Sequence, residues 1–188
     1  MIDSNFTQVF DTEELLHLAA HAGTAGNVHT ALAHLKELLQ REPKHARALY
    51  LLGAQHAEIG LFPRAIAEMK AALSIEPGFE IARLQLGLLL LDRHQLDEAK
   101  QQLSQLAGSA MPALRLYSAA LIALADDQLP RARELLGQGL KQTPINAAMS
   151  ALMKRIYDGL ENQAATTAAN SQDAGANRVF LGAYRDAS

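Results

Sequence analysis

Four alanines recur at a nearly constant interval in this 188-residue chain, and this period constrains the fold more than any other feature. Ala31, Ala65, Ala99 and Ala132 lie 34, 34 and 33 residues apart. Further columns keep nearly the same spacing: Ala19, Gly53, Gly87 and Ala120; Val28, Phe62, Leu96 and Leu129; Leu35, Met69, Leu103 and Leu136; and Pro43, Pro77, Pro112 and Pro144, of which Pro112 comes one place late. Several columns with one period indicate an array of structural repeats.

Each repeat has the pattern of a helical hairpin. In the second repeat, apolar spacing predicts a first helix over about 46–59 and a second over about 63–74, with a turn at Gly60. Gly53 and Ala65 are small, which indicates close approach of the two backbones. In later repeats, we therefore expect Gly87→Leu to be severely destabilising. Gly139→Ala is expected to be harmless or stabilising by roughly 0.5–1 kcal/mol, because Gly139 falls within a predicted helix.

Composition narrows the fold class and the class of partner. Hydrophobic residues make up 49% of the chain and aromatic residues only 5%, and Ala and Leu dominate, as is typical of helical proteins. The formal net charge of −3 offers no field that would attract nucleic acid or an anionic membrane. Without cysteine, the chain has no thiolate metal site or disulfide. The first residues do not resemble a signal peptide, and the apolar run 86–91 is too short to span a membrane, so we expect a cytoplasmic, all-α protein.

Two segments identify the closest family pattern. LYLLGAQHAEIGLFPRAIAEMKAALSIEP (49–77) and LQLGLLLLDRHQLDEAKQQL (84–103) carry its small, apolar and proline columns. The chain resembles the tetratricopeptide repeat family. This resemblance implies a right-handed α-solenoid of helix–turn–helix hairpins, with repeats over about 12–45, 46–79, 80–112 and 113–146.

The two ends of the chain differ from the repeats. Residues 147–160 predict an amphipathic helix that caps the array (12–160), and residues 1–11 an N-terminal arm carrying Phe6, Val9 and Phe10. The small polar residues of 161–177 predict a flexible linker. The last segment, 178–188, is apolar and aromatic again and predicts a docking tail formed by Val179, Phe180, Leu181 and Tyr184.

The sequence offers little catalytic chemistry. It contains no phosphate-binding glycine loop, nucleophile elbow or zinc-protease motif. His17 and His21 share a helix face, but solvated side chains explain them better than a zinc site. His56 stands in a column that is usually aromatic in the family, which favours a packing role, and Asp126 with Asp127 fits a turn. We therefore predict no enzyme activity, no metal and no cofactor.

The resemblance implies that the second, fifth, ninth and twelfth positions of each first helix line a concave groove. In the first repeat these are Glu13, Leu16, Ala20 and Gly23. In the later repeats the partner groove is expected at Arg47, Tyr50, Ala54, Leu84, Leu88, Leu91, Tyr117, Leu121 and Leu124. Family members that hold a peptide carboxylate place Lys and Asn where this chain has Leu16, Ala20, Tyr50 and Ala54, so that function is disfavoured.

Helix 81–92 is apolar around nearly its whole circumference and must be covered on all sides. Either it is core, or a bound partner covers it. The partner hypothesis predicts that polar replacement of Leu88 and Tyr117 abolishes binding without loss of the fold.

The leading hypothesis is a non-catalytic adaptor or scaffold that binds an apolar or amphipathic segment of a protein partner in this groove. The alternatives are a chaperone resembling those of bacterial type III secretion, and a structural protein that self-assembles through its ends or by tail exchange.

Overall fold

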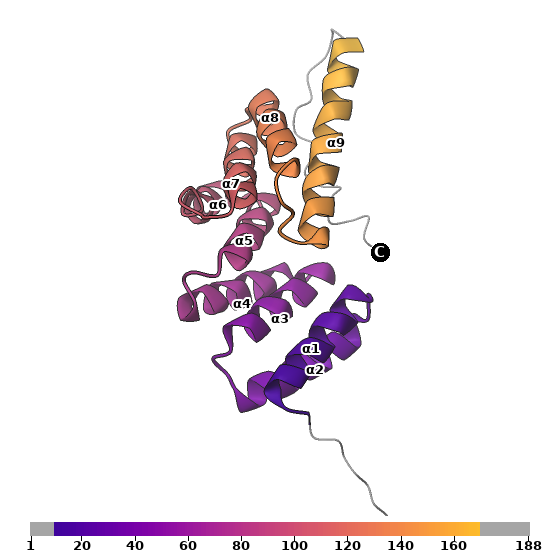
Figure 1. Ribbon diagram of the computed structural model, residues 1–188, viewed down its shortest axis with the longest axis vertical. Helices are drawn as coiled ribbons and strands as arrows, with labels where there is room; N and C mark the ends of the chain where they lie inside the picture. Colours follow the sequence, from indigo (N-terminus) through magenta and orange to yellow (C-terminus); the bar gives the residue numbers. More distant parts are fainter. Residues whose placement is uncertain (1–9, 170–188) are drawn as a thin grey trace, which may run out of the picture. The chain divides into compact units, whose positions relative to one another are not determined.

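The structure of the protein is a computed structural model, which describes residues 10–169 of the chain. Throughout this range the secondary structure is α-helical, without strands. Figure 1 shows the helices in chain order: α1 (Thr12–Thr24), α2 (Val28–Arg41), α3 (Ala46–Glu58), α4 (Phe62–Ile75), α5 (Glu80–Asp92), α6 (Leu96–Ser104), α7 (Pro112–Ala125), α8 (Leu129–Leu140) and α9 (Ala147–Ala169). Four consecutive hairpins followed by a ninth helix match the four predicted repeats and their capping helix.

Several helices begin at residues that satisfy the free N–H groups of a first turn. Asp11 and Glu14 form a capping box at α1, with both hydrogen bonds at 2.8 Å. Asn27 caps α2, and the Nδ1 atom of His45 accepts a hydrogen bond from the Ala48 N–H at the start of α3. α4, α7 and α8 instead carry proline in the first turn, where the missing N–H has no intrahelical partner to lose.

The turn inside each hairpin repeats one backbone conformation. Gly26, Gly60, His94 and Asp127 occupy the same repeat position, with φ values of 75°, 76°, 57° and 56°. This left-handed region costs a residue with a Cβ about 1–2 kcal/mol, whereas glycine adopts it without that cost. The first two hairpins therefore turn at glycine, whereas His94 and Asp127 hold a less favourable conformation.

We expect Gly60→Ala to lower the free energy of unfolding by about 1–2 kcal/mol, through backbone strain alone, because an added Cβ would contact nothing within 4 Å. Urea unfolding followed by circular dichroism measures the loss. Gly78→Ala is the matched control, since Gly78 also has open space around it but no left-handed φ. Equal midpoints for the two variants would contradict this explanation of the turn.

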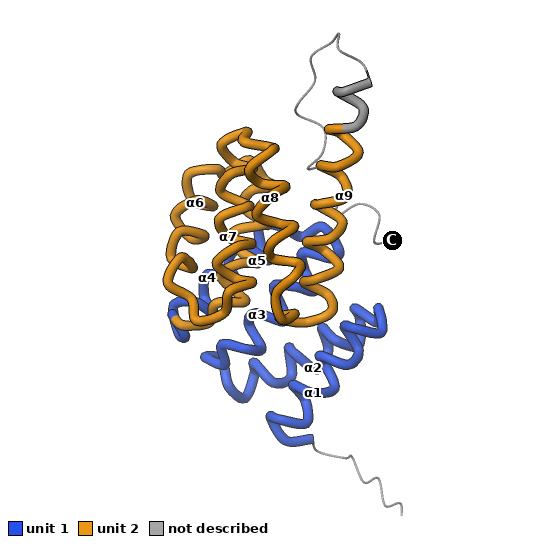
Figure 2. The backbone as a smooth tube through the Cα atoms, turned by 45° about the horizontal axis from the view of Figure 1, so that its top comes forward, with its two compact units in different colours: residues 1–77 blue, residues 78–188 orange. Residues whose placement is uncertain are grey.

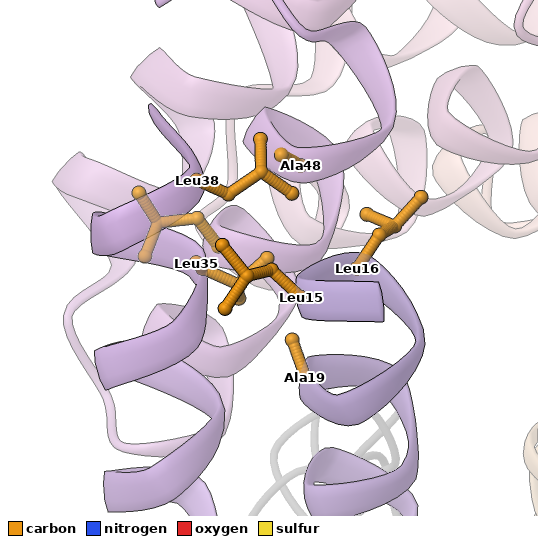
Figure 3. Close-up of a cluster of buried hydrophobic side chains, with 7 residues drawn as sticks. Leu15, Leu16, Ala19, Leu35, Leu38 and Ala48 are labelled. Carbon is orange, nitrogen blue, oxygen red and sulfur yellow. The ribbon is translucent and has the colours of Figure 1, made fainter. Parts of the chain in front are cut away.

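The chain falls into two compact units, residues 1–77 and 78–188 (Figure 2). Unit 1 contains α1 to α4, and unit 2 contains α5 to α9. In unit 1, a hydrophobic cluster joins the first hairpin to α3 (Figure 3), and Phe10 packs against it. The cluster consists of Leu15, Leu16, Ala19, Leu35, Leu38, Ala48 and Leu52. Phe10 of the predicted N-terminal arm thus packs against the first hairpin, while Phe6 and Val9 lie outside the described residues.

The small-residue columns mark close contact between the two helices of a hairpin. Ala31, Ala65, Ala99 and Ala132 are each 0% exposed. A Cβ built on Gly53 would lie 3.0 Å from the backbone oxygen of Ala65, so the two backbones meet at this level as the sequence predicts. This packing explains why both columns avoid larger side chains.

The capping helix is longer than predicted. α9 runs to Ala169, so residues 161–169 continue the helix and do not begin a linker. Alanine has the highest helix propensity, and Glu161 accepts a hydrogen bond from the Tyr157 hydroxyl at 3.0 Å, one turn back. The rest of the predicted linker, 170–177, and the segment 178–188 lie outside the described residues.

The join between the third and fourth hairpins departs from the regular repeat. α6 has only nine residues, and an irregular stretch follows it before α7. In this stretch Ser109 is 3% exposed, and its hydroxyl donates a 2.8 Å hydrogen bond to Glu80 of α5. The same oxygen accepts a hydrogen bond from the Met111 N–H at the start of α7. Ser109 therefore links α5 and α7, the first helices of the third and fourth hairpins. This link lies at the join where Pro112 comes one place late in the proline column.

Candidate partner-binding surface

Several titratable side chains of the described residues join neighbouring helices. The Nδ1 atom of His56 lies 2.7 Å from Glu68 Oε2, which joins α3 to α4, and His56 is buried as its packing role predicts. His17 and His21 are exposed on α1. Asp126 forms an ion pair with Lys100. Burial raises the pKa of the Asp92 carboxyl, and the nearby charges of Arg93 and His94 partly offset this rise. Between residues 10 and 169, no group of three or more His, Asp or Glu side chains is placed to hold a metal ion.

The predicted groove positions of unit 2 are buried. Their exposed fractions are at most 7%, for Leu84, Leu88, Leu91, Tyr117, Leu121 and Leu124. The expectation that these six side chains line an open partner groove therefore needs correction. A partner cannot contact them without rearrangement of the unit, and polar replacement of Leu88 or Tyr117 is now expected to damage the fold.

α5 accounts for three of these buried residues. Nine of its 13 residues are buried, including the charged Arg83, which donates a 2.9 Å hydrogen bond to Gln102 of α6. This nearly all-apolar helix was expected either to be part of the core or to be covered by a bound partner. Its burial in the structure fits the first explanation.

Tyr117 is held by the helices that follow it in the chain. Its side chain is 2% exposed and hydrogen-bonds with Ser150 of α9. Burial raises the pKa of the Tyr117 hydroxyl above its usual range, and the hydrogen bond with Ser150 partly offsets the rise. A Cβ built on Gly139 of α8 would lie 2.5 Å from the Tyr117 ring. Gly139 thus provides the space that the ring occupies, a role that repeat position alone did not indicate.

The predicted groove positions of unit 1 remain at the surface, except Leu16, which is 8% exposed and belongs to the hydrophobic cluster instead of a groove. On α3, Arg47 is exposed, and Tyr50 and Ala54 are half-buried. On α1, which packs beside α3, Ala20 and Gly23 are half-buried. The structure thus leaves Arg47, Tyr50 and Ala54, of the nine predicted groove residues, accessible on one face of unit 1.

Gln55 of α3 adds a feature that the sequence analysis missed. It is 7% exposed, and its amide nitrogen would lie 2.7 Å from a Cβ built on Gly23 of α1. Gly23 is therefore small because the Gln55 amide packs against it. Within the described part of the chain, the carbonyl oxygen of this amide is buried without a hydrogen-bond partner. The available signal in the sequence was a polar residue with apolar Leu51 one turn before it and apolar Ile59 one turn after it.

The predicted docking tail falls beyond the part of the chain that the structure describes. Val179, Phe180, Leu181 and Tyr184 all lie outside the described residues. None of the described helices is both long enough and apolar enough to cross a bilayer.

Comparison with known proteins agrees with the hairpin architecture. Residues 16–78 match the tetratricopeptide repeat family. The human FK506-binding protein-like protein is 31% identical over 86 residues, which cover 46% of this chain and 25% of that protein. The mouse protein of the same name is 31% identical over 81 residues, or 43% of this chain and 23% of that protein. The chain therefore spans about a quarter of the length of these relatives.

Solved structures share the fold at lower sequence identity. TTC0263, a tetratricopeptide repeat protein of Thermus thermophilus, is 23% identical with a TM-score of 0.64, covering 81% of this chain and 82% of its own. PilF of Pseudomonas aeruginosa is 18% identical with a TM-score of 0.63, covering 94% and 76% respectively. With the family match over residues 16–78 and four observed hairpins, these likenesses lead to one assignment: residues 16–78 carry tetratricopeptide repeats, and the described chain has the fold of a tetratricopeptide repeat solenoid.

Proposed function

We propose that this chain is a non-catalytic adaptor that binds an apolar or amphipathic segment of a partner protein, and that α1 and α3 of unit 1 supply the contact surface. Tetratricopeptide repeat proteins generally mediate protein–protein interaction, and the match to this family covers most of unit 1.

The observation that carries the proposal is a difference in burial between equivalent positions. At the fifth and ninth positions of the first helix, the second repeat has half-buried Tyr50 and Ala54, whereas the fourth has Tyr117 and Leu121 at 2% and 0% exposure. Only side chains that are accessible before binding are available to a partner without local unfolding. The partner surface is therefore assigned to α3 and its neighbour α1, and the buried positions of unit 2 are left out of it.

The chemistry of this face suits a segment that lies close to the helices. Ala20 and Ala54 are small, which allows a partner backbone or an apolar side chain to approach closely. Tyr50 provides an aromatic contact of the type that is enriched at binding hot spots. Arg47 adds an exposed positive charge at the start of α3, which suits an acidic group at the edge of an amphipathic segment.

The test compares two Ala→Asp variants of the full chain. Ala54→Asp places a charge on the proposed surface, and Ala67→Asp places the same charge on an exposed position of α4. Proteins captured from a native lysate by the wild-type chain are identified by mass spectrometry, and the affinity of the captured partner is then measured. We expect Ala54→Asp and Tyr50→Ala to weaken binding at least tenfold, roughly the effect of losing 1.4 kcal/mol. Ala67→Asp should bind like the wild type.

Melting temperatures separate loss of binding from loss of fold. All three variants should melt close to the wild type, because the altered side chains are exposed or half-buried. A partner that binds Ala54→Asp and Ala67→Asp equally well would contradict the assignment of the surface to α1 and α3.

A further inference from the structure

α9 has a small contact surface on α7 and α8 of unit 2, which we call its seat. It also carries features that stabilise it as a helix on its own. Its buried apolar side chains among the described residues are Met149, Met153 and Leu160. Two of the three are methionines, whose flexible side chains adapt to irregular surfaces. In Figures 1 and 2, α9 lies alongside α8, at the edge of unit 2.

The polar contacts of α9 define the seat. Ser150 lies near the Tyr117 hydroxyl of α7 and lowers its pKa, and Glu161 lies 3.4 Å from Arg133 of α8 in an ion pair. Between these contacts, a Cβ built on Gly137 of α8 would lie 3.2 Å from the Tyr157 ring of α9. Positions 133 and 137 thus face 161 and 157, so the two helices run antiparallel with a defined register.

The helix carries its own stabilising contacts. Asn146 caps it by accepting a 2.7 Å hydrogen bond from the Met149 N–H. Lys154 pairs with Asp158 at 2.7 Å, four residues on. With 23 residues, many of them alanine, α9 exceeds the roughly 12–15 residues below which isolated helices are marginal in water. It can therefore leave its seat as a formed helix, keeping its backbone hydrogen bonds.

The connection to α8 permits such a movement. Residues 141–146 join the two helices, and four of these six residues are exposed. Pro144 restricts Thr143 to extended conformations, which separates the ends of the connection. Six extended residues span up to about 20 Å, enough to carry the start of α9 away from its own α8.

From these contacts we propose that α9 is an exchangeable element, which docks on α7 and α8 of a second copy of this chain in the same way as on its own. The second copy then supplies the Ser150 hydroxyl to Tyr117 and the Glu161 carboxylate to Arg133. Exchange re-forms every contact of α9 and changes only the conformation of residues 141–146, so it is a low-cost route to a dimer. This self-association is independent of partner binding at α1 and α3.

The absence of native cysteine makes the exchange directly testable. Arg133→Cys and Glu161→Cys chains are each prepared, mixed in equal amounts at high concentration and treated with a short bismaleimide. Both side chains are about two-fifths exposed, so the fold should tolerate either substitution. Exchange predicts covalent dimers linked between positions 133 and 161 of different chains. In the matched control, Arg131→Cys replaces Arg133→Cys, because Arg131 is exposed and pairs with Glu134 of its own helix. The control mixture should form several-fold less of the dimer.

The double variant Arg133→Cys/Glu161→Cys shows whether positions 133 and 161 can be linked within one chain, which is needed to interpret the mixture of single variants. At low concentration it should close within one chain, and light scattering should then give a monomer that no longer exchanges. If the double variant closes but the mixed single variants link no more than the control, α9 does not exchange and the proposal fails. A double variant that does not close would also overturn it, because the seat itself would then be absent.

Discussion

We expect the Gly87→Leu chain to lose about 3 kcal/mol or more of its free energy of unfolding, a large share of the 5–15 kcal/mol typical of a native domain. A Cβ built on Gly87 of α5 would lie 2.5 Å from Cδ2 and 2.6 Å from Cγ of Leu103 on α6. Leu103 is 0% exposed, so a larger side chain at position 87 must displace this buried side chain or force the two helices apart. Urea unfolding followed by circular dichroism measures the loss.

Two comparisons isolate the cause of the Gly87 effect. Gly108→Leu makes the same substitution at a glycine of unit 2 with nothing within 4 Å of an added Cβ, and should change stability little. Leu103→Ala opens space opposite Gly87, so Gly87→Ala should cost less in that background than in the wild type. Equal stability of the Gly87→Leu and Gly108→Leu chains would show that α5 and α6 do not meet at this level.

The second large effect is expected at Gly139, where alanine should lower the free energy of unfolding by about 1–3 kcal/mol. Helix propensity alone predicts the opposite sign, a gain of roughly 0.5–1 kcal/mol. In the structure, the new Cβ would lie 2.5 and 2.7 Å from two atoms of the Tyr117 ring. The ring is 2% exposed, so moving it aside would disturb the side chains packed around it.

Gly108→Ala serves as the matched control for Gly139→Ala, with open space around the added methyl group. A Gly139→Ala chain that is as stable as the wild type, or more stable, would mean that Tyr117 does not pack against this position.

The hairpins were predictable because each depends on contacts between residues close in sequence. Ala65 packs against Gly53 only twelve residues away, and this spacing recurs in every repeat, so the small-residue columns report the contact directly. The same reasoning failed for the end of α9. The small polar residues of 161–169 were interpreted as a linker, whereas their alanine content and the Tyr157–Glu161 hydrogen bond extend the helix.

The candidate surface was predictable only in part, because repeat position does not report what later elements cover. Tyr50 and Tyr117 occupy the same repeat position, yet one is half-buried and the other is enclosed by Gly139 and Ser150. Ser150 lies outside the repeats and carries no repeat signal. The family pattern therefore identifies which side chains belong to the first helices, and only the packing of α7, α8 and α9 decides which of them a partner can reach.

Hydroxyl-radical footprinting of the full chain, with and without its captured partner, tests the proposed surface most directly. Tyr50 and Tyr157 are both half-buried and Tyr117 is 2% exposed, so the free chain should be oxidised at the first two and protected at the third. The account predicts that the bound partner lowers the oxidation rate of Tyr50 several-fold and leaves that of Tyr157 unchanged. Unchanged oxidation of Tyr50 in the complex, with new protection confined to unit 2, would contradict it.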